Sequence, residues 1–190
     1  MNLDSHPGYR IEEMTRAELF PHVKANRDMF GENLIFSSKQ AMDESEREAI
    51  DRLAKNMNST FKLNLALFHG DDFAGWSYGW QTDHETYYMT NSAILTAHRR
   101  KGLYTALMDQ TVARVKAEGF QIILSGHAAT NNAVLIPKLK FGFLISSMEI
   151  SDLFGTLVHL RFYINPTRRK MMDVRSGQAR PDAELMKLLK

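Results

Sequence analysis

The chain has 190 residues, of which 44% are hydrophobic and 24% are charged, and its formal net charge is +2. This composition is typical of a globular protein, and the length fits one domain with a core large enough to fold unaided. The sequence has no cysteine, which excludes disulfides, thiolate metal sites and a covalent acyl-cysteine intermediate. No apolar run approaches the roughly 18–20 residues of a membrane span, and residues 1–9 contain no apolar core of signal-peptide length. We therefore expect a cytoplasmic protein with no membrane partner.

The charge is unevenly distributed along the chain. Residues 166–190 contain seven Lys or Arg and three acidic residues, a net charge of +4, which leaves −2 for residues 1–165. Proteins that bind nucleic acid usually carry their basic stripe on the folded body, so this pattern favours a solvated tail or a contact in a homodimer over nucleic-acid binding. We predict one folded domain over residues 1–165, followed by a basic C-terminal tail with a short helix from Pro181.

The N-terminal third predicts a strand followed by two helices. Tyr9 to Met14 reads as a short strand. Thr15 and Glu18 then form a capping box, in which each side chain accepts a hydrogen bond from a backbone N–H at a helix start. The helix should continue to about Phe30. A second helix is expected over about residues 38–58, where apolar residues follow a helical stripe.

Three strands are predicted next, because the apolar pattern changes to period two. They span about residues 61–68, 73–81 and 86–95. The short turns between them contain Gly, Asp and Thr, which favour tight connections. We therefore expect an antiparallel meander.

The segment after the meander predicts a crossover to a parallel strand. The loop of residues 96–102 leads into a helix over about Leu103 to Glu118, and Gly119 ends it. Residues 120–125 form an apolar run typical of a buried strand.

A short helix over about residues 131–140 and strands over about 143–150 and 156–165 complete the domain. The sequence thus predicts an α/β (α+β) fold in which helices flank a mixed, mostly antiparallel sheet. The element order is β-α-α-β-β-β-α-β-α-β-β.

The start of the helix at Leu103 combines several features that suit a phosphate group. Helix N-termini present unpaired N–H groups and a positive partial charge. Arg99, Arg100 and Lys101 add formal charge, and Gly102 allows the backbone to approach a ligand closely. No Walker or dinucleotide-binding glycine pattern occurs in the sequence. A plain basic surface loop is the alternative interpretation.

At these residues the sequence resembles the GNAT superfamily of N-acetyltransferases. The family's pyrophosphate signature is Arg or Gln, two residues, Gly, one residue, then Gly or Ala. Arg99-Arg-Lys-Gly102-Leu-Tyr104 matches it except at Tyr104, the last position. The segment from Asn131 to Phe143 is similar to the family's second motif, in which an Asn precedes a helix ending in Gly-Phe. The resemblance covers about residues 9–165.

The resemblance implies acetyl-CoA as acyl donor, and no metal. Backbone groups of residues 94–96 would pair with the pantetheine arm, and an N–H near Ile94 or Leu95 would stabilise the oxyanion. Asn131 would bond the pantetheine, cap its own helix, or do both. The implied coenzyme A contacts are Ile94, Leu95, Thr96, Arg99, Arg100, Lys101, Gly102, Leu103, Tyr104, Thr105 and Asn131.

Candidates for proton transfer are fewer. The family's acid is often a Tyr of the second motif, and Lys138 stands at that position; as an ammonium it could stabilise a thiolate. The family's base is often acidic and lies on the strand before the loop, but here only Glu85 stands at the start of that strand. His127 is our preferred base because imidazole titrates near neutral pH, with a hydrogen-bonded loop histidine as the alternative. Tyr88 and Tyr104 are reserve candidates.

The resemblance therefore implies an N-acetyltransferase that moves an acetyl group from acetyl-CoA to an amine by direct attack in a ternary complex. A catalytically silent acyl-CoA sensor or scaffold of the same fold is the alternative. The acceptor amine stays open between a small molecule and a peptide. The alternating Trp76, Tyr78 and Trp80 favour core packing over an acceptor-pocket wall. The histidines show no metal-ligand spacing such as HExxH.

Overall fold

The computed structural model describes residues 3–30, 43–45, 48 and 60–188. Most of the second helix expected over residues 38–58 therefore lies outside the described residues. The remaining elements can be compared with the sequence-based expectations one by one.

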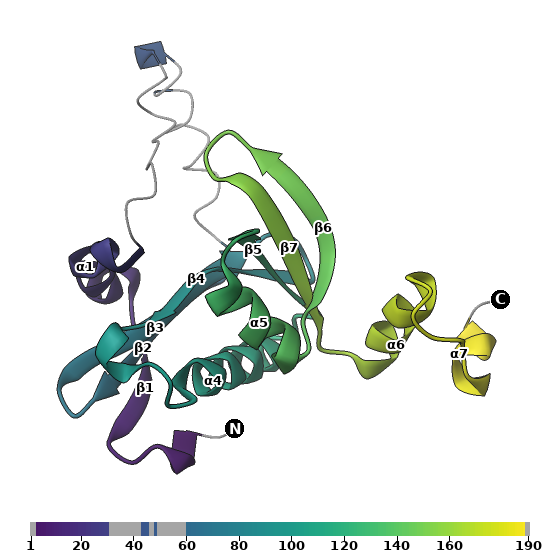
Figure 1. Ribbon diagram of the computed structural model, residues 1–190, viewed down its shortest axis with the longest axis horizontal. Coiled ribbons are helices and arrows are strands. Elements are labelled where there is room, and N and C mark those ends of the chain that lie inside the picture. Colours follow the sequence, from purple (N-terminus) through teal and green to yellow (C-terminus); the bar gives the residue numbers. More distant parts are fainter. Residues whose placement is uncertain (1–2, 31–42, 46–47, 49–59, 189–190) are drawn as a thin grey trace.

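A seven-stranded sheet forms the centre of the molecule, with strand order β1-β2-β3-β4-β5-β7-β6 (Figure 1). Its strands are β1 (Tyr9–Glu13), β2 (Lys62–His69), β3 (Asp72–Gln81), β4 (Thr86–Ile94), β5 (Ile122–Ala128), β6 (Leu144–Ser151) and β7 (Gly155–Tyr163). All neighbouring pairs are antiparallel except β4 and β5, which are parallel. The predicted mixed, mostly antiparallel sheet and its meander are confirmed.

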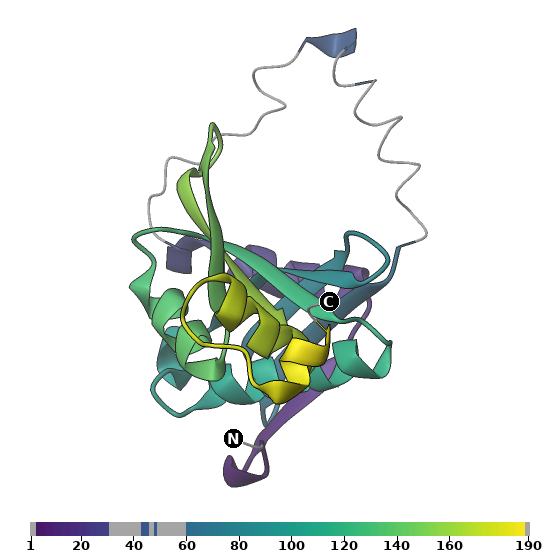
Figure 2. The ribbon, with the colours of Figure 1, turned by 90° about the vertical axis from the view of Figure 1, so that its right-hand side faces the viewer.

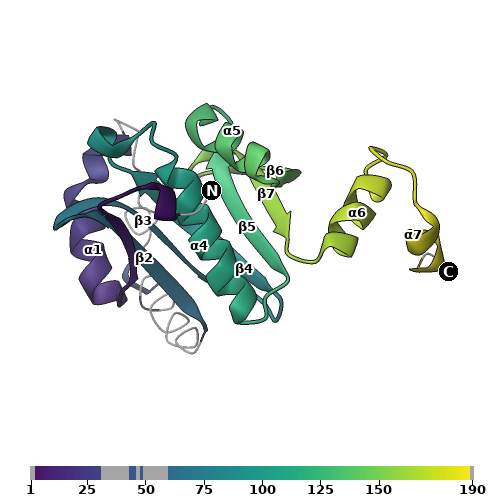
Figure 3. The ribbon, with the colours of Figure 1, turned by 90° about the horizontal axis from the view of Figure 1, so that it is seen from below.

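Helices cover both faces of this sheet (Figure 3). Helix α1 (Arg16–Ala25) packs on one face, where Leu19 and Val23 contact Trp76 in a small core cluster. Helices α4 (Leu103–Ala117) and α5 (Asn132–Phe141) pack on the other face over the larger core cluster. We call these the α1 face and the α4/α5 face.

The start of α1 is fixed by the predicted capping box. Thr15 Oγ1 accepts from the Glu18 N–H at 3.3 Å, and Glu18 Oε2 accepts from the Thr15 N–H at 2.8 Å. The helix ends at Ala25, earlier than expected, and a 3-10 turn over Arg27–Phe30 continues it.

The C-terminal tail is more helical than the sequence suggested. Helices α6 (Pro166–Arg175) and α7 (Ala183–Leu188) project beyond the edge of the sheet (Figure 1), and they lie in front of it when the molecule is viewed from that side (Figure 2). Only a helix from Pro181 was expected, so α6 was missed. Its signal was present, because Asn165 caps the helix and Pro166 occupies the first turn.

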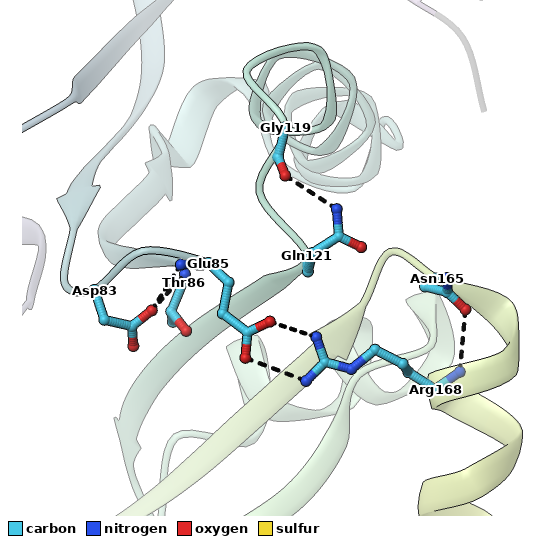
Figure 4. A network of polar contacts seen from close by, with 7 residues as sticks. All are labelled: Asp83, Glu85, Thr86, Gly119, Gln121, Asn165 and Arg168. Carbon is cyan, nitrogen blue, oxygen red and sulfur yellow. Dashed lines mark hydrogen bonds and ion pairs between the residues drawn. The ribbon is translucent and has the colours of Figure 1, made fainter. Parts of the chain in front are cut away.

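An ion pair fastens α6 to the body of the domain (Figure 4). Arg168 donates two hydrogen bonds to the carboxylate of Glu85, at 2.6 and 3.2 Å. This bidentate ion pair holds the first turn of α6 against the beginning of β4.

Strands β4 and β5 separate soon after they meet. They pair over only three positions, from Thr86 with Ile122 to Tyr88 with Leu124. Beyond Leu124, β5 continues to pair with β7 but no longer with β4. The edge of β4 from Met89 to Ile94 is therefore not covered by β5.

Candidate active site

The loop before α4 exposes a run of backbone amides. A 3-10 turn over Thr96–His98 leads into Arg100 and Gly102, which both have left-handed backbones with φ of 62° and 79°. Among the described residues, no acceptor is found for the N–H groups of residues 100–104. The predicted phosphate-binding loop thus has the donors that an anion requires.

The end of β4 narrows the predicted oxyanion donor to one residue. The Leu95 N–H is donated to the carbonyl of Ala74 at 2.8 Å, which leaves Ile94 as the better candidate of the two predicted residues. Backbone groups alternate in direction along an antiparallel strand, so the Ile94 N–H points away from β3, towards the uncovered edge. The Ile94 carbonyl accepts from Arg99 Nε at 3.0 Å.

The Tyr9 side chain of β1 contacts two residues of the loop before α4. Lys101 Nζ donates to the Tyr9 hydroxyl at 3.0 Å, and that hydroxyl lies 2.9 Å from His98 Nδ1. These bonds tie both loop residues to the first strand. The positive charge of Lys101 is therefore kept beside the open amides.

Tyr104, the departure from the family signature, points into the domain. Its ring packs against the larger core cluster, and its hydroxyl lies 3.1 Å from Ser92 Oγ on β4. Burial raises the pKa of Tyr104 to about 12, while the hydrogen bond to Ser92 acts in the opposite direction. The large ring therefore leaves the backbone amides of the loop accessible.

A β-bulge in β4 brings two further side chains together. The register of β3 and β4 shifts between Tyr78 and Gly79, so that Thr90 is the extra residue. Met89 and Ser92, three positions apart, consequently lie on the same α4/α5 face, with Ser92 Oγ 4.0 Å from Met89 Sδ. Without the bulge they would point to opposite faces.

Lys138 of α5 is the most unusual residue of the site, because its side chain is completely buried. Its Nζ donates to Ser125 Oγ at 2.8 Å and to Met89 Sδ at 3.1 Å, and lies 5.0 Å from the centre of the Phe143 ring. No described carboxylate is within ion-pair distance of this amine. Burial therefore lowers the pKa of Lys138 to about 7.

His127 is linked to Lys138 by Ser125, whose hydroxyl contacts both side chains. His127 Nε2 is 3.2 Å from Ser125 Oγ, since residues two apart on β5 share a face. Burial, and then the charges of Lys138 and His159, lower the pKa of His127 to about 3. An imidazole with this pKa binds a proton poorly at neutral pH. The interpretation of His127 as a hydrogen-bonded histidine fits this environment better than the role of base.

Three of the predicted proton-transfer residues, Tyr104, Lys138 and His127, thus lie on one chain of contacts across the α4/α5 face. We call this chain the polar seam. It consists of Tyr104, Ser92, Met89, Lys138, Ser125 and His127. The two serines were not predicted, although Ser125 ends a predicted strand two residues before His127.

The remaining candidates lie elsewhere. Glu85 stands at the opposite end of β4 from the loop, and its hydrogen bonds with Arg168 lower its pKa (Figure 4). Tyr88 points to the α1 face, where burial raises its pKa. Asn131 precedes α5 but makes no side-chain capping bond, so the capping interpretation was wrong.

The alternating aromatic residues of β3 are divided between two environments. Trp76 is fully buried beneath α1, and its Nε1 donates to Asn91 Oδ1 at 2.7 Å. Core packing is therefore confirmed for Trp76. Tyr78 and Trp80 are only half-buried, and the Trp80 ring centre lies 5.9 Å from that of Tyr88.

The described part of the chain contains no group of three or more His, Cys, Asp or Glu that could hold a metal ion. None of the helices in these residues has both the length and the apolar character needed to cross a bilayer.

Comparison with solved structures places this fold among acetyltransferases. A GNAT family acetyltransferase from Elizabethkingia anophelis, with acetyl-CoA bound, has a TM-score of 0.60 and 13% identity, and the match covers 83% of this chain and 99% of that one. The yncA protein of Salmonella typhimurium, solved with acetyl-CoA, has a TM-score of 0.60, 14% identity and coverages of 93% and 99%. The ribosomal-protein-S18-alanine N-acetyltransferase of Escherichia coli has a TM-score of 0.61, 16% identity and coverages of 83% and 94%.

Comparison at the level of sequence agrees with the fold. A search of curated proteins returned no significant match. The family model described as the acetyltransferase (GNAT) family matches residues 26–143, which is more than half of the chain. The matched segment includes both the amide loop and the whole polar seam. The chain therefore belongs to the GNAT acetyltransferase family.

Proposed function

We propose that this protein is an N-acetyltransferase, which transfers an acetyl group from acetyl-CoA to an amine by direct attack in a ternary complex. Acetyl-CoA supplies the activated thioester. Membership of the family supports acetyl transfer, and two of the solved relatives hold acetyl-CoA. The open amides before α4 support the binding of a diphosphate at that loop.

The binding residues follow from the geometry of the loop. The N–H groups of residues 100–104 would hold the pyrophosphate, with charge from Arg99 and Lys101. The Ile94 N–H would bond the thioester carbonyl and stabilise the charge that develops on its oxygen. Thr96, Thr105 and the exposed side chain of Asn131 are proposed as further contacts.

The polar seam contains a group that could protonate the coenzyme A thiolate as it leaves. Burial lowers the pKa of Lys138 to about 7, so it can donate a proton near neutral pH to the departing thiolate, since thiols such as that of cysteine have a higher pKa of about 8.5. In the family the acid is often a tyrosine, and we propose that Lys138 replaces it. Tyr104 and His127 would orient the seam through Ser92 and Ser125. The buried, unpaired amine of Lys138 is the observation that carries this assignment.

A second candidate function is an acyl-CoA-binding sensor or scaffold without turnover. The pKa of about 3 at His127 favours it, because the polar seam then holds a proton donor but no proton acceptor. The predicted acceptors are a small amine or a peptide amine. The cytoplasmic location and the homodimer stay predictions.

Two measurements test the proposal. Calorimetry should detect coenzyme A binding, and replacing both Arg99 and Lys101 by Ala should weaken it about tenfold at low salt and less at high salt. Thiol release from acetyl-CoA should then depend on an amine, tested with a polyamine, free lysine, a peptide with a free N-terminus and an aminoglycoside. Binding without release from any amine would support the sensor, and no binding would contradict both functions.

A further inference from the structure

A second pair of titratable side chains lies on the opposite face of the sheet from the polar seam. His159 of β7 and Glu149 of β6 form a close pair, with Nε2 and Oε2 2.6 Å apart. The His159 side chain is 16% exposed and that of Glu149 is 52% exposed. The imidazole is thus largely covered but reachable from solvent, unlike the amine of Lys138.

A β-bulge creates this pair. The register of β6 and β7 shifts between Ile145 and Ser147, which makes Ser146 the extra residue, and Ser146 Oγ donates to the His159 carbonyl at 3.1 Å. Ser147 then pairs with His159, so Glu149 falls on the same face as the imidazole. Without the extra residue Glu149 would point to the α4/α5 face.

The free side of the imidazole faces Gly126 of β5 and the Tyr88 hydroxyl. An ideal Cβ at Gly126 would lie 3.3 Å from His159 Nδ1 and 3.2 Å from the Tyr88 hydroxyl oxygen. Because Gly126 has no side chain, both polar groups pack closely over the backbone of β5 at this point. Gly126 stands two residues after Leu124, the last residue of β5 that pairs with β4. His159 and Tyr88 therefore lie together where the two strands separate.

We propose that His159 is the general base of the transfer, that Glu149 positions its imidazole, and that the acceptor amine approaches His159 on the α1 face, on the side of the Tyr88 hydroxyl. This assignment rests on the proposed acetyltransferase function. With Nε2 held by the carboxylate, Nδ1 is the atom that can accept a proton. Imidazole is the side chain best suited to this task near neutral pH.

The transfer then uses both faces of the sheet. The ammonium group gives one proton to His159 Nδ1, and the lone pair of the neutral amine forms a bond to the carbonyl carbon of the thioester. The carbon–sulfur bond breaks, the sulfur takes a proton from Lys138 on the α4/α5 face, and the nitrogen loses its second proton as the amide forms. Of the two protons that leave the nitrogen, one makes up for the proton that Lys138 has given to the sulfur and the other is released to solvent, so that one proton is released per turnover.

Four charged or titratable groups surround His159 on the strands packed around it. They are Tyr88 on β4, His127 on β5, Glu149 on β6 and Arg161, which shares its face of β7. Of these four groups, Glu149 is the one whose carboxylate contacts the His159 imidazole, at Nε2. A cross-strand contact without a role in proton transfer is the alternative that the experiment must exclude.

The test compares His159→Gln with the unmodified protein and with His84→Gln, which changes an exposed histidine in the turn before β4. Glutamine keeps a hydrogen-bond donor for Glu149 but cannot take up a proton. We expect kcat/KM for the best amine of the panel to fall about 100-fold in His159→Gln at neutral pH. Coenzyme A affinity should stay unchanged by calorimetry, and His84→Gln should behave as the unmodified protein.

The pH profile separates the base from a structural contact. In His159→Gln, log kcat/KM should rise with a slope of about one up to the pKa of the amine, because only solvent remains to take the proton. Glu149→Gln should lose about tenfold in kcat with little change in KM. Activity of His159→Gln within threefold of the unmodified protein across the pH range would overturn this proposal alone. Absence of turnover by the unmodified protein would contradict the proposed function as well.

Discussion

His127 and His159 lie one strand apart on opposite faces of the same sheet, and their surroundings differ sharply. His127 faces the core beside Ser125 and the buried amine of Lys138, and its pKa is lowered to about 3. His159 contacts a carboxylate and faces Gly126 and the Tyr88 hydroxyl where β4 and β5 separate. A histidine that lies beside a predicted site is therefore not necessarily the general base of that site. The groups that share its face of the sheet decide its chemistry.

The largest effect should come from removing the proton donor on the buried side. Lys138→Met should lower kcat about 100-fold or more, because the sulfur then leaves without a proton. Since Lys138 acts in its protonated form, the fall in rate above about pH 7 should disappear in the variant. Thiol release as a function of pH measures both. Unchanged kcat in a folded variant would contradict a catalytic role for this lysine.

The stability of Lys138→Met provides the control for that result. The folded-state pKa is depressed from 10.5 to about 7, so the cost of burying the charge is full below about 7 and vanishes above the unfolded value. The variant should therefore be more stable by roughly 2–4 kcal/mol near pH 6, and this advantage should shrink towards pH 10. Urea unfolding at several pH values measures it. A less stable variant at every pH would show that Lys138 supports the fold instead.

A smaller effect is expected from adding a methyl group at Gly126, beside the proposed base. Gly126→Ala adds a Cβ 3.2 Å from both His159 Cε1 and the Tyr88 hydroxyl oxygen, so these groups must move by a few tenths of an ångström. We expect kcat/KM to fall about tenfold, because a misplaced base loses much of its effect. Coenzyme A affinity should not change in calorimetry. Full activity of Gly126→Ala would show that the position of these groups does not matter to the reaction.

The smallest effect should follow from His127→Gln. Its imidazole stays neutral from about pH 5 upwards, and the glutamine amide can replace its hydrogen bond to Ser125. We expect kcat/KM within about threefold of the unmodified protein, measured by the same thiol-release assay. A loss as large as that of His159→Gln would restore His127 as the base.

Local signals along the chain were sufficient for much of the fold. The capping box at Thr15 and Glu18, the period-two strands and the glycine before α4 each depend on residues within one turn or hairpin. The loop before α4 was predictable as a candidate phosphate site for the same reason, because its charge and its glycine stand together at residues 99–102. Residues 166–175 carried an equally local signal, the Asn-Pro helix start, which the sequence analysis did not use.

The pairing of His159 with Glu149 could not be predicted from such local signals. His159 and Glu149 meet only because β7 pairs with both β5 and β6, and because Ser146 shifts the register by one residue. Neither the strand order nor the bulge leaves a pattern in the sequence. The burial of Lys138 depends likewise on how α5 packs over β4 and β5, since its neighbours Ile136 and Leu139 are the exposed ones.

The pH dependence of kcat/KM in the unmodified protein, His159→Gln and Lys138→Met tests most directly whether proton acceptance and proton donation are divided between the two faces. We predict a bell-shaped profile for the unmodified protein, displacement of its acid limb to the pKa of the amine in His159→Gln and loss of its basic limb in Lys138→Met. A bell whose two limbs are unchanged in both variants would contradict the account, because the protons would then be moved by other groups.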